Sequence, residues 1–246
     1  MKGTDQIYDP YDQIPFAGYL SDIDGQPETY WSLMHFLEAE KMRGVDDQYR
    51  RYLLELRDRD YFVMETACIG QSIRREDWSE VRASVIYAGL MMQLAQNKEA
   101  LQHSLLADSF QCEAEIITEV RASLLERLRD PEPLRRVLFV GTGQEQNAQI
   151  NSLFDHIFMK RKPDEIITFA EPGVCTAAAK YAHAHYIPFR AFSLQEDLSA
   201  VAQDAVSRSS HVFQIGADDS ATPITKIAFD LACQTKKTAH QLAWEQ

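Results

Sequence analysis

The chain has 246 residues, of which 45% are hydrophobic and 25% charged, and these proportions are ordinary for a globular protein. The sequence contains no apolar run of about 18 residues and no basic-then-apolar leader, so we predict a soluble, unsecreted, cytoplasmic protein without a membrane partner. The formal net charge is −12, and residues 1–130 carry most of it, with 14 basic against 24 acidic side chains. This acidic half argues against polymeric nucleic acid as a partner, because phosphates need a basic footprint.

The first predicted helix covers Thr29–Met42 and has an unusual face. Helical spacing places five of its residues on one stripe: Tyr30, Met34, Leu37, Glu38 and Lys41. A buried ammonium group is costly unless it is paired or loses its proton. Two interpretations of Lys41 therefore remain open. It either reaches the surface and pairs with Glu38, or it is held in a pocket as a nucleophile or anion-binding group.

Helices dominate the rest of residues 1–130, with a short hairpin predicted around Asp24–Gly25. Asp77 and Glu80 have the spacing of a capping pair at the start of a helix. Trp78 then lies in the first turn of that helix, as a core residue or as a stacking surface for a ligand. A last amphipathic helix is predicted from Glu113 to Arg129.

Three segments in this order resemble the NADAR (YbiA-like) family of N-glycosidases: residues 29–42, 77–82 and 94–97. The first is similar to the family pattern Thr-x-Glu-His-Tyr-x-Gln-Ala-x-Lys-Phe, and the second to its Trp-x-x-Val-Arg pattern. The resemblance covers about residues 14–128. It implies a mainly helical fold and cleavage of an N-glycosidic bond to ribose, including ADP-ribose attached to a base.

The resemblance also implies which residues act. Lys41 is carried over as the nucleophile or anion-holding group, and Trp78 as the stacking surface. Met34 stands where the family has its glutamate, so Glu38 or Glu40 is expected to supply the acid–base group instead. We therefore predict Lys41, Glu38 and Trp78 as catalytic residues.

The pattern changes at Asp130–Pro133, where two prolines stop a helix and stiffen the connection. Strand and helix patterns then alternate, which predicts right-handed crossovers and a mainly parallel sheet. The four predicted strands are Arg136–Val140, Glu165–Phe169, Phe189–Phe192 and His211–Ile215. The predicted fold class is thus α + α/β, with a mainly helical domain over 1–130 and a small, doubly wound, Rossmann-like sheet domain over 135–246.

Ligands of such sheets bind beyond the carboxyl ends of the strands, where three glycine-containing loops are expected here. The residues predicted to bind a ligand in these loops are Gly141, Thr142, Gly143, Gly173, Gly216 and Asp218. Helix N-termini at this edge present free amides to an anion. Position 146 is Gln rather than a third glycine, and short glycine turns also occur without a ligand. These loops are therefore either a phosphate-binding site or ordinary turns between strand and helix.

The segment Ile167–Ala182, followed by Ile187-Pro-Phe, resembles the SLOG superfamily of Rossmann-like nucleotide-binding domains, especially its YspA-like branch. The resemblance covers about residues 135–246 and implies nucleotide binding. Phe169 and Ala170 stand at the paired glycines of that branch, and Cys175 at its aspartate.

Both resemblances imply the same partner, a nucleotide or ADP-ribose-like small molecule, and two functions remain open. One is a hydrolase that acts on an N-glycosidic bond of such a ligand. The other is a non-catalytic protein that binds a nucleotide signal or serves as a scaffold. No metal and no cofactor is predicted, since the four cysteines are far apart and are expected to be reduced, buried thiols. Whether the chain forms a homo-oligomer stays open.

Overall fold

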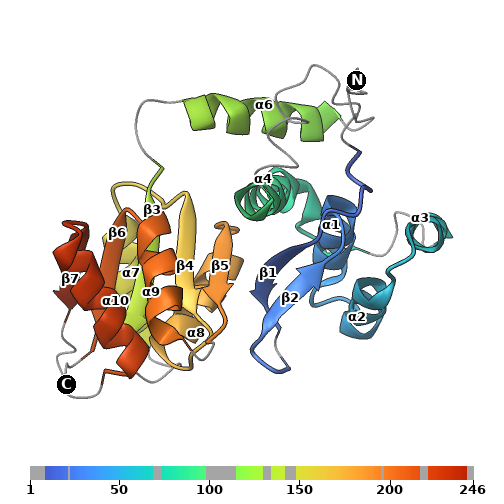
Figure 1. Cartoon of the computed structure of the whole chain (residues 1–246). Helices are drawn as coiled ribbons and strands as arrows, with labels where there is room; N and C mark the ends of the chain where they lie inside the picture. Colours follow the sequence, from blue (N-terminus) through green and yellow to red (C-terminus); the bar gives the residue numbers. More distant parts are fainter. Residues whose placement is uncertain are drawn as a thin grey trace, which may run out of the picture. The chain divides into compact units, whose positions relative to one another are not determined.

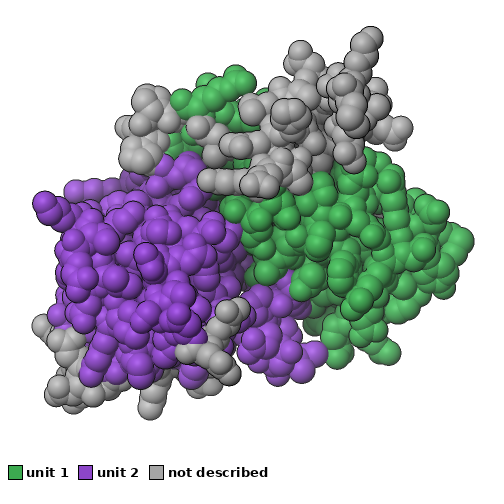
Figure 2. All heavy atoms as spheres, viewed as in Figure 1, with its two compact units in different colours: residues 1–18, 29–131 green, residues 19–28, 132–246 purple. Residues whose placement is uncertain are grey.

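The computed structural model describes residues 9–21, 23–68, 74–97, 115–129, 134–141, 148–194, 197–216 and 221–242. The chain divides into two compact units (Figure 2). The first unit comprises residues 1–18 and 29–131, and the second comprises residues 19–28 and 132–246. The boundary predicted at Asp130–Pro133 lies outside the described residues.

A hairpin and a series of helices make up the N-terminal part of the chain (Figure 1). Strands β1 (Phe16–Leu20) and β2 (Pro27–Tyr30) pair in a two-stranded sheet. Gly25 forms the turn with a φ of 66°, and its amide donates to the Ser21 carbonyl at 3.0 Å, which confirms the predicted hairpin. The helices that follow are α1 (Leu33–Met42), α2 (Asp47–Glu55), α3 (Arg59–Cys68), α4 (Trp78–Gln96) and α6 (Glu115–Arg129).

The first helix begins at Leu33, so the prediction that it starts at Thr29 is wrong. Ser32 is the N-cap, and its hydroxyl accepts a hydrogen bond from the His35 amide at 3.3 Å. The residues before this cap form strand β2, which ends at Tyr30. Tyr30 therefore belongs to the strand and not to the helical stripe. Its ring is fully buried.

A small core joins the first three helices. The residues that form it or pack against it are Met42, Leu53, Phe62, Tyr11, Met34, Tyr49 and Leu56. The imidazole of His35 stacks on the Phe62 ring with 3.7 Å between centroids. Its Nε2 donates to the Leu56 carbonyl at 2.8 Å, and its Nδ1 lies 2.8 Å from the Ser32 hydroxyl. These contacts hold α2 and α3 against α1.

The second unit contains a five-stranded sheet in the order β5-β4-β3-β6-β7, in which every neighbouring pair is parallel. Its strands are β3 (Arg136–Gly141), β4 (Glu165–Phe169), β5 (Phe189–Phe192), β6 (His211–Ile215) and β7 (Thr238–Leu242). The four predicted strands and the parallel sheet are confirmed. Strand β7 was not predicted, because this edge strand is largely exposed and lacks an apolar run.

Helices cover both faces of this sheet (Figure 1). The helices are α7 (Ala148–Phe158), α8 (Val174–Ala184), α9 (Leu198–Arg208) and α10 (Pro223–Gln234). The face under α9 and α10 is packed by Leu138, Val140, Ile167, Val212, Ala202, Ala205, Ile224 and Ala228. On the other face, the centroid of the Phe139 ring lies 4.8 Å from the centroid of the Phe154 ring on α7. This alternation follows from the two-residue period of a strand.

Among the described residues, no helix combines the length and the apolar character that crossing a membrane requires.

Candidate functional site

The structure brings together the three predicted catalytic residues, Glu38, Lys41 and Trp78. Glu38 and Lys41 lie one turn apart on α1, and the lysine Nζ donates to the glutamate Oε1 at 2.5 Å. The Nζ also lies 5.8 Å from the centre of the Trp78 ring. The exposed fractions are 29% for the Lys41 side chain and 11% for that of Glu38, whereas Trp78 is buried. A carboxylate, an ammonium group and an indole therefore meet at one place in the first unit.

The geometry agrees with the interpretation in which Lys41 pairs with Glu38 and reaches the surface. An ammonium group that donates to a carboxylate has no lone pair for attack on a substrate carbon. The arrangement therefore favours Lys41 as a held cation for anion binding over Lys41 as a nucleophile.

Backbone and ion-pair contacts hold Trp78 beside Lys41. The Arg75 amide donates to the Lys41 carbonyl at 2.9 Å, which ties the segment before α4 to the end of α1. The Asp77 carboxylate accepts from the Arg75 guanidinium at 2.5 and 2.9 Å, and this arginine lowers the pKa of Asp77. Asp77 makes no side-chain capping bond, so the predicted capping pair with Glu80 is wrong. The Asp77 carboxylate forms an ion pair with Arg75 instead.

Glu40, the second acid considered for the site, has a different role. It is fully buried, and its two oxygens accept from the Arg43 guanidinium at 2.8–3.2 Å. Arg43 also donates to the Tyr30 hydroxyl at 3.4 Å. Residues two apart on a helix point to different sides, which separates this structural ion pair from Glu38. Glu38 is therefore the candidate acid–base group.

Two residues that the sequence did not indicate as site residues interact beside α1. Tyr49 is within range of the charge of Glu38, and it contacts Glu65. The Tyr49 hydroxyl donates to Glu65 Oε1 at 3.5 Å. Burial raises the pKa of Tyr49, and the negative charges of Glu65 and Glu38 raise it further. The phenol thus stays protonated, and it donates that proton to Glu65. No local pattern pointed to these residues, because α2 and α3 bring them to α1 only in the folded chain.

A second candidate region is the carboxyl edge of the five-stranded sheet. Gly141 ends β3, Gly216 follows β6, and Gly173 precedes α8. All three have positive φ angles. At Gly141, a Cβ atom would lie 2.0 Å from the Ile215 carbonyl oxygen of β6, so only glycine fits there. The other predicted ligand-binding residues, Thr142, Gly143 and Asp218, lie outside the described residues.

An acid that was not among the predicted site residues, Glu171, also lies at this edge. It follows β4, is half-buried, and accepts from the Thr222 hydroxyl at 3.1 Å. Thr222 is the N-cap of α10, and its hydroxyl accepts from the Thr225 amide at 3.3 Å. Burial raises the pKa of Glu171, and the bond from Thr222 opposes this shift. An acid at this position suits the hydroxyl groups of a ribose better than a phosphate. The signal available in the sequence was an acid inside the predicted edge loop.

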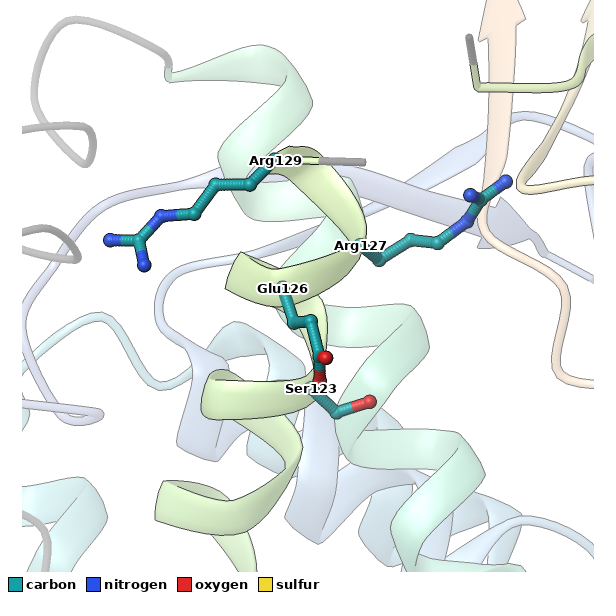
Figure 3. A pocket seen from close by; sticks show the side chains of 4 residues that line it. All are labelled: Ser123, Glu126, Arg127 and Arg129. Carbon is teal, nitrogen blue, oxygen red and sulfur yellow. The ribbon is translucent and has the colours of Figure 1, made fainter. Parts of the chain in front are cut away.

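A surface hollow of about 530 Å³ lies on α6 in the first unit. The described residues that line it are Ser123, Glu126, Arg127 and Arg129. Figure 3 shows that the two arginine side chains point to different sides of the helix. They do not converge on one point, and none of the predicted site residues that the structure describes lines this hollow, so we assign no function to it.

The described residues contain no group of three or more His, Cys, Asp or Glu side chains that could hold a metal ion. Cys175 is buried, and burial raises the pKa of its thiol to about 12. Cys68 and Cys233 are free thiols but exposed, so the prediction that these two are buried is wrong. No family model, curated protein or solved structure matches the chain.

Proposed function

We propose that this protein recognises a nucleotide or ADP-ribose-like ligand and that the first unit hydrolyses the N-glycosidic bond between ribose and base. The observation that carries the proposal is the grouping of Glu38, Lys41 and Trp78. The resemblance of α1 and the start of α4 to the NADAR family supports the reaction class. The glycine-containing edge of the second unit, with its resemblance to the SLOG superfamily, supports the ligand class.

The three side chains have complementary tasks in such a reaction. The bond from C1′ to the base nitrogen breaks through an oxocarbenium-like state, with both electrons going to the nitrogen. Glu38 offsets the positive charge of that state and accepts a proton from the water that adds to C1′. This proton passes on to the departing base, so water is the only co-reactant. Lys41 holds an anionic group of the ligand, and the buried Trp78 ring positions the lysine through a cation–π contact.

The test is release of free base from ADP-ribosylated nucleobases and from nucleotides, followed by chromatography. Glu38→Gln keeps the shape of the side chain but removes the carboxylate that acts as general base, and it should lower kcat by about 100-fold or more. Lys41→Met should mainly raise KM, because it removes an anion contact. Glu80→Gln, an exposed carboxylate change in the same unit, is the matched control and should leave both constants unchanged. Equal rates in all variants would contradict the proposal.

A second candidate function is ligand binding without turnover. The observation that favours it is Met34, which stands at the glutamate position of the NADAR pattern and packs against the small core of Met42, Leu53 and Phe62. A methionine in this setting supplies no proton. A wild-type protein that binds ADP-ribose but releases no base from any substrate would be a receptor for that ligand.

A further inference from the structure

The amino edge of the five-stranded sheet, at the other ends of the strands from the glycine-containing loops, carries a buried group of charges. Arg136 opens β3 and is the register partner of Glu165, which opens β4. Arg190 on β5 is the register partner of Ile167, so it shares a face with Glu165. Ile167 belongs to the core under α9 and α10, which places these three charged side chains on that face.

One carboxylate serves two guanidinium groups at this place. Glu165 Oε2 lies 3.3 Å from Arg136 Nε, and Oε1 lies 3.5 Å from Arg190 Nε. Glu165 is buried, and the exposed fractions of the Arg136 and Arg190 side chains are 20% and 13%. Neither approach has hydrogen-bond geometry. Arg136 Nε, Arg190 Nε and Arg190 Nη2 are buried without a hydrogen-bond partner among the described residues.

Such donors are unusual. A buried polar group without a partner loses its hydration and gains no hydrogen bond in exchange, and the loss of hydration free energy is larger for a charged group. The aromatic face of Phe192, 5.8 Å from the Arg190 guanidinium carbon, provides only partial compensation. Two carbonyls at the end of α9, those of Ser207 and Ser209, accept hydrogen bonds from Lys237 Nζ at 3.4 and 2.7 Å.

The local charge is also out of balance. The last turns of α9 add an ion pair beside Arg190, in which Arg208 Nε donates to Asp204 at 2.8 Å. Three guanidinium groups, of Arg136, Arg190 and Arg208, then share the carboxylates of Glu165 and Asp204. Burial lowers the pKa of Arg190; the carboxylates of Glu165 and Asp204 oppose this shift, and the guanidinium groups of Arg208 and Arg136 add to it. Within this group of described side chains, the positive charges exceed the negative ones by one, in a chain whose net charge is −12.

We propose that Arg190 and Arg136 form a binding site for a small oxyanion of the phosphate class at the amino edge of the sheet. The planar guanidinium fork matches the oxygen spacing of a phosphate and forms short, charge-assisted hydrogen bonds with it. Both side chains are partly exposed, so an ion can approach from solvent after a small side-chain rotation. The site goes beyond the proposed hydrolase or receptor function and shares no residue with it.

The test is the melting temperature of the whole protein in inorganic phosphate against chloride at equal ionic strength, with Kd values from titration. A second arm uses glycerol phosphate, which distinguishes a phosphate monoester from the free ion. We expect phosphate to stabilise the wild type. Arg190→Met should weaken phosphate binding by about tenfold or more, which corresponds to about 1.4 kcal/mol. Lys236→Gln, the same charge change at an exposed position of the second unit, should bind phosphate as the wild type does.

For a further variant we expect the affinity for phosphate to change in the opposite direction. Glu165→Gln removes the carboxylate that competes with the ion, so it should tighten phosphate binding. Arg190→Lys, which keeps the charge but loses the fork, serves if Arg190→Met does not fold, and it should weaken binding. An equal phosphate response in the wild type, Arg190→Met and Lys236→Gln would reflect the general exclusion of phosphate from protein surfaces and would overturn the proposal. So would the absence of any response in the wild type.

Discussion

At the residue scale, Tyr49 contacts one carboxylate, that of Glu65, within range of the charge of the candidate acid Glu38. The phenol donates to Glu65 and experiences the charges of both acids. The electrostatic surroundings of Glu38 therefore include residues that the sequence did not indicate.

The first prediction concerns this contact. Glu65→Gln removes a negative charge beside the phenol, and the pKa of Tyr49 should therefore fall. A titration that follows the NMR signal of the Tyr49 Cζ carbon measures this change, with Glu55→Gln on the exposed side of α2 as the control. A Tyr49 pKa that is the same in the wild type and in Glu65→Gln would show that the two side chains do not interact in solution.

The second prediction concerns His35, whose burial lowers its pKa below the ordinary value of 6.5, although the Leu56 carbonyl opposes the shift. The unfolded chain then binds the proton first as the pH falls. The contribution of His35 to stability is therefore complete above pH 6.5 and is lost below it, as the pH approaches the folded-state pKa.

Urea unfolding at pH 7.5 and pH 5.5, each about one unit from that value, measures this effect. The free energy of unfolding should fall more for the wild type than for His35→Gln, whose amide can still contact Ser32 and Leu56. His211, whose pKa is also lowered, contributes equally to both proteins. Identical acid losses in the two proteins would mean that His35 does not titrate as its burial implies.

At the scale of elements, the close pairing of β3 with β6 depends on Gly141. This residue has a φ of 139° and is the register partner of Ile215. The adjacent strands leave no room for a side chain, so the carboxyl edge can form only with glycine there.

The third prediction follows from this contact. Gly141→Ala should destabilise the protein by about 2–4 kcal/mol, because the strands must separate and the backbone is strained. Gly25→Ala is the matched control, since Gly25 also has a positive φ but a methyl group there would meet no described atom within 4 Å. It should cost only about 1 kcal/mol. Urea unfolding compares the two, and equal losses would show that the close approach to Ile215 is unimportant.

The elements differ in how well their sequences predicted them. The central strands are buried after the first residue of β3 and of β6, and they appear as mainly apolar runs, so their bounds could be predicted within a residue. Strand β7 could not, because it lies at an edge and its residues are mostly polar. The predicted start of α1 was wrong because Tyr30 fits a helical stripe as well as a strand. Only the pairing of β2 with β1 distinguishes the two.

At the scale of the whole molecule, each unit carries a candidate region for one class of ligand. Glu38, Lys41 and Trp78 belong to the first unit, and Gly141, Gly173, Gly216 and Glu171 to the second. Variants confined to one unit can therefore show which region binds ADP-ribose.

The fourth prediction is that ADP-ribose raises the melting temperature of the wild type. A ligand that binds only the folded state adds about 2.7 kcal/mol of stability at one hundred times its Kd. Lys41→Met should remove the shift if the ligand binds in the first unit, and Glu171→Ala should reduce it if the ligand binds in the second. A wild-type protein without any shift in millimolar ADP-ribose and related nucleotides would contradict the proposed ligand class.

Local patterns in the chain were enough to predict the alternation of strands and helices after residue 135, the parallel sheet, and the meeting of Glu38 with Lys41. These features depend on periodicity and on spacing along one element. Folding in three dimensions was needed to show that Tyr49 contacts Glu65 within range of the charge of Glu38, and that Glu171 meets Thr222. It was needed also to place two arginines around Glu165. Each of these contacts joins residues that are distant in the sequence, and the groups become buried only when their elements pack.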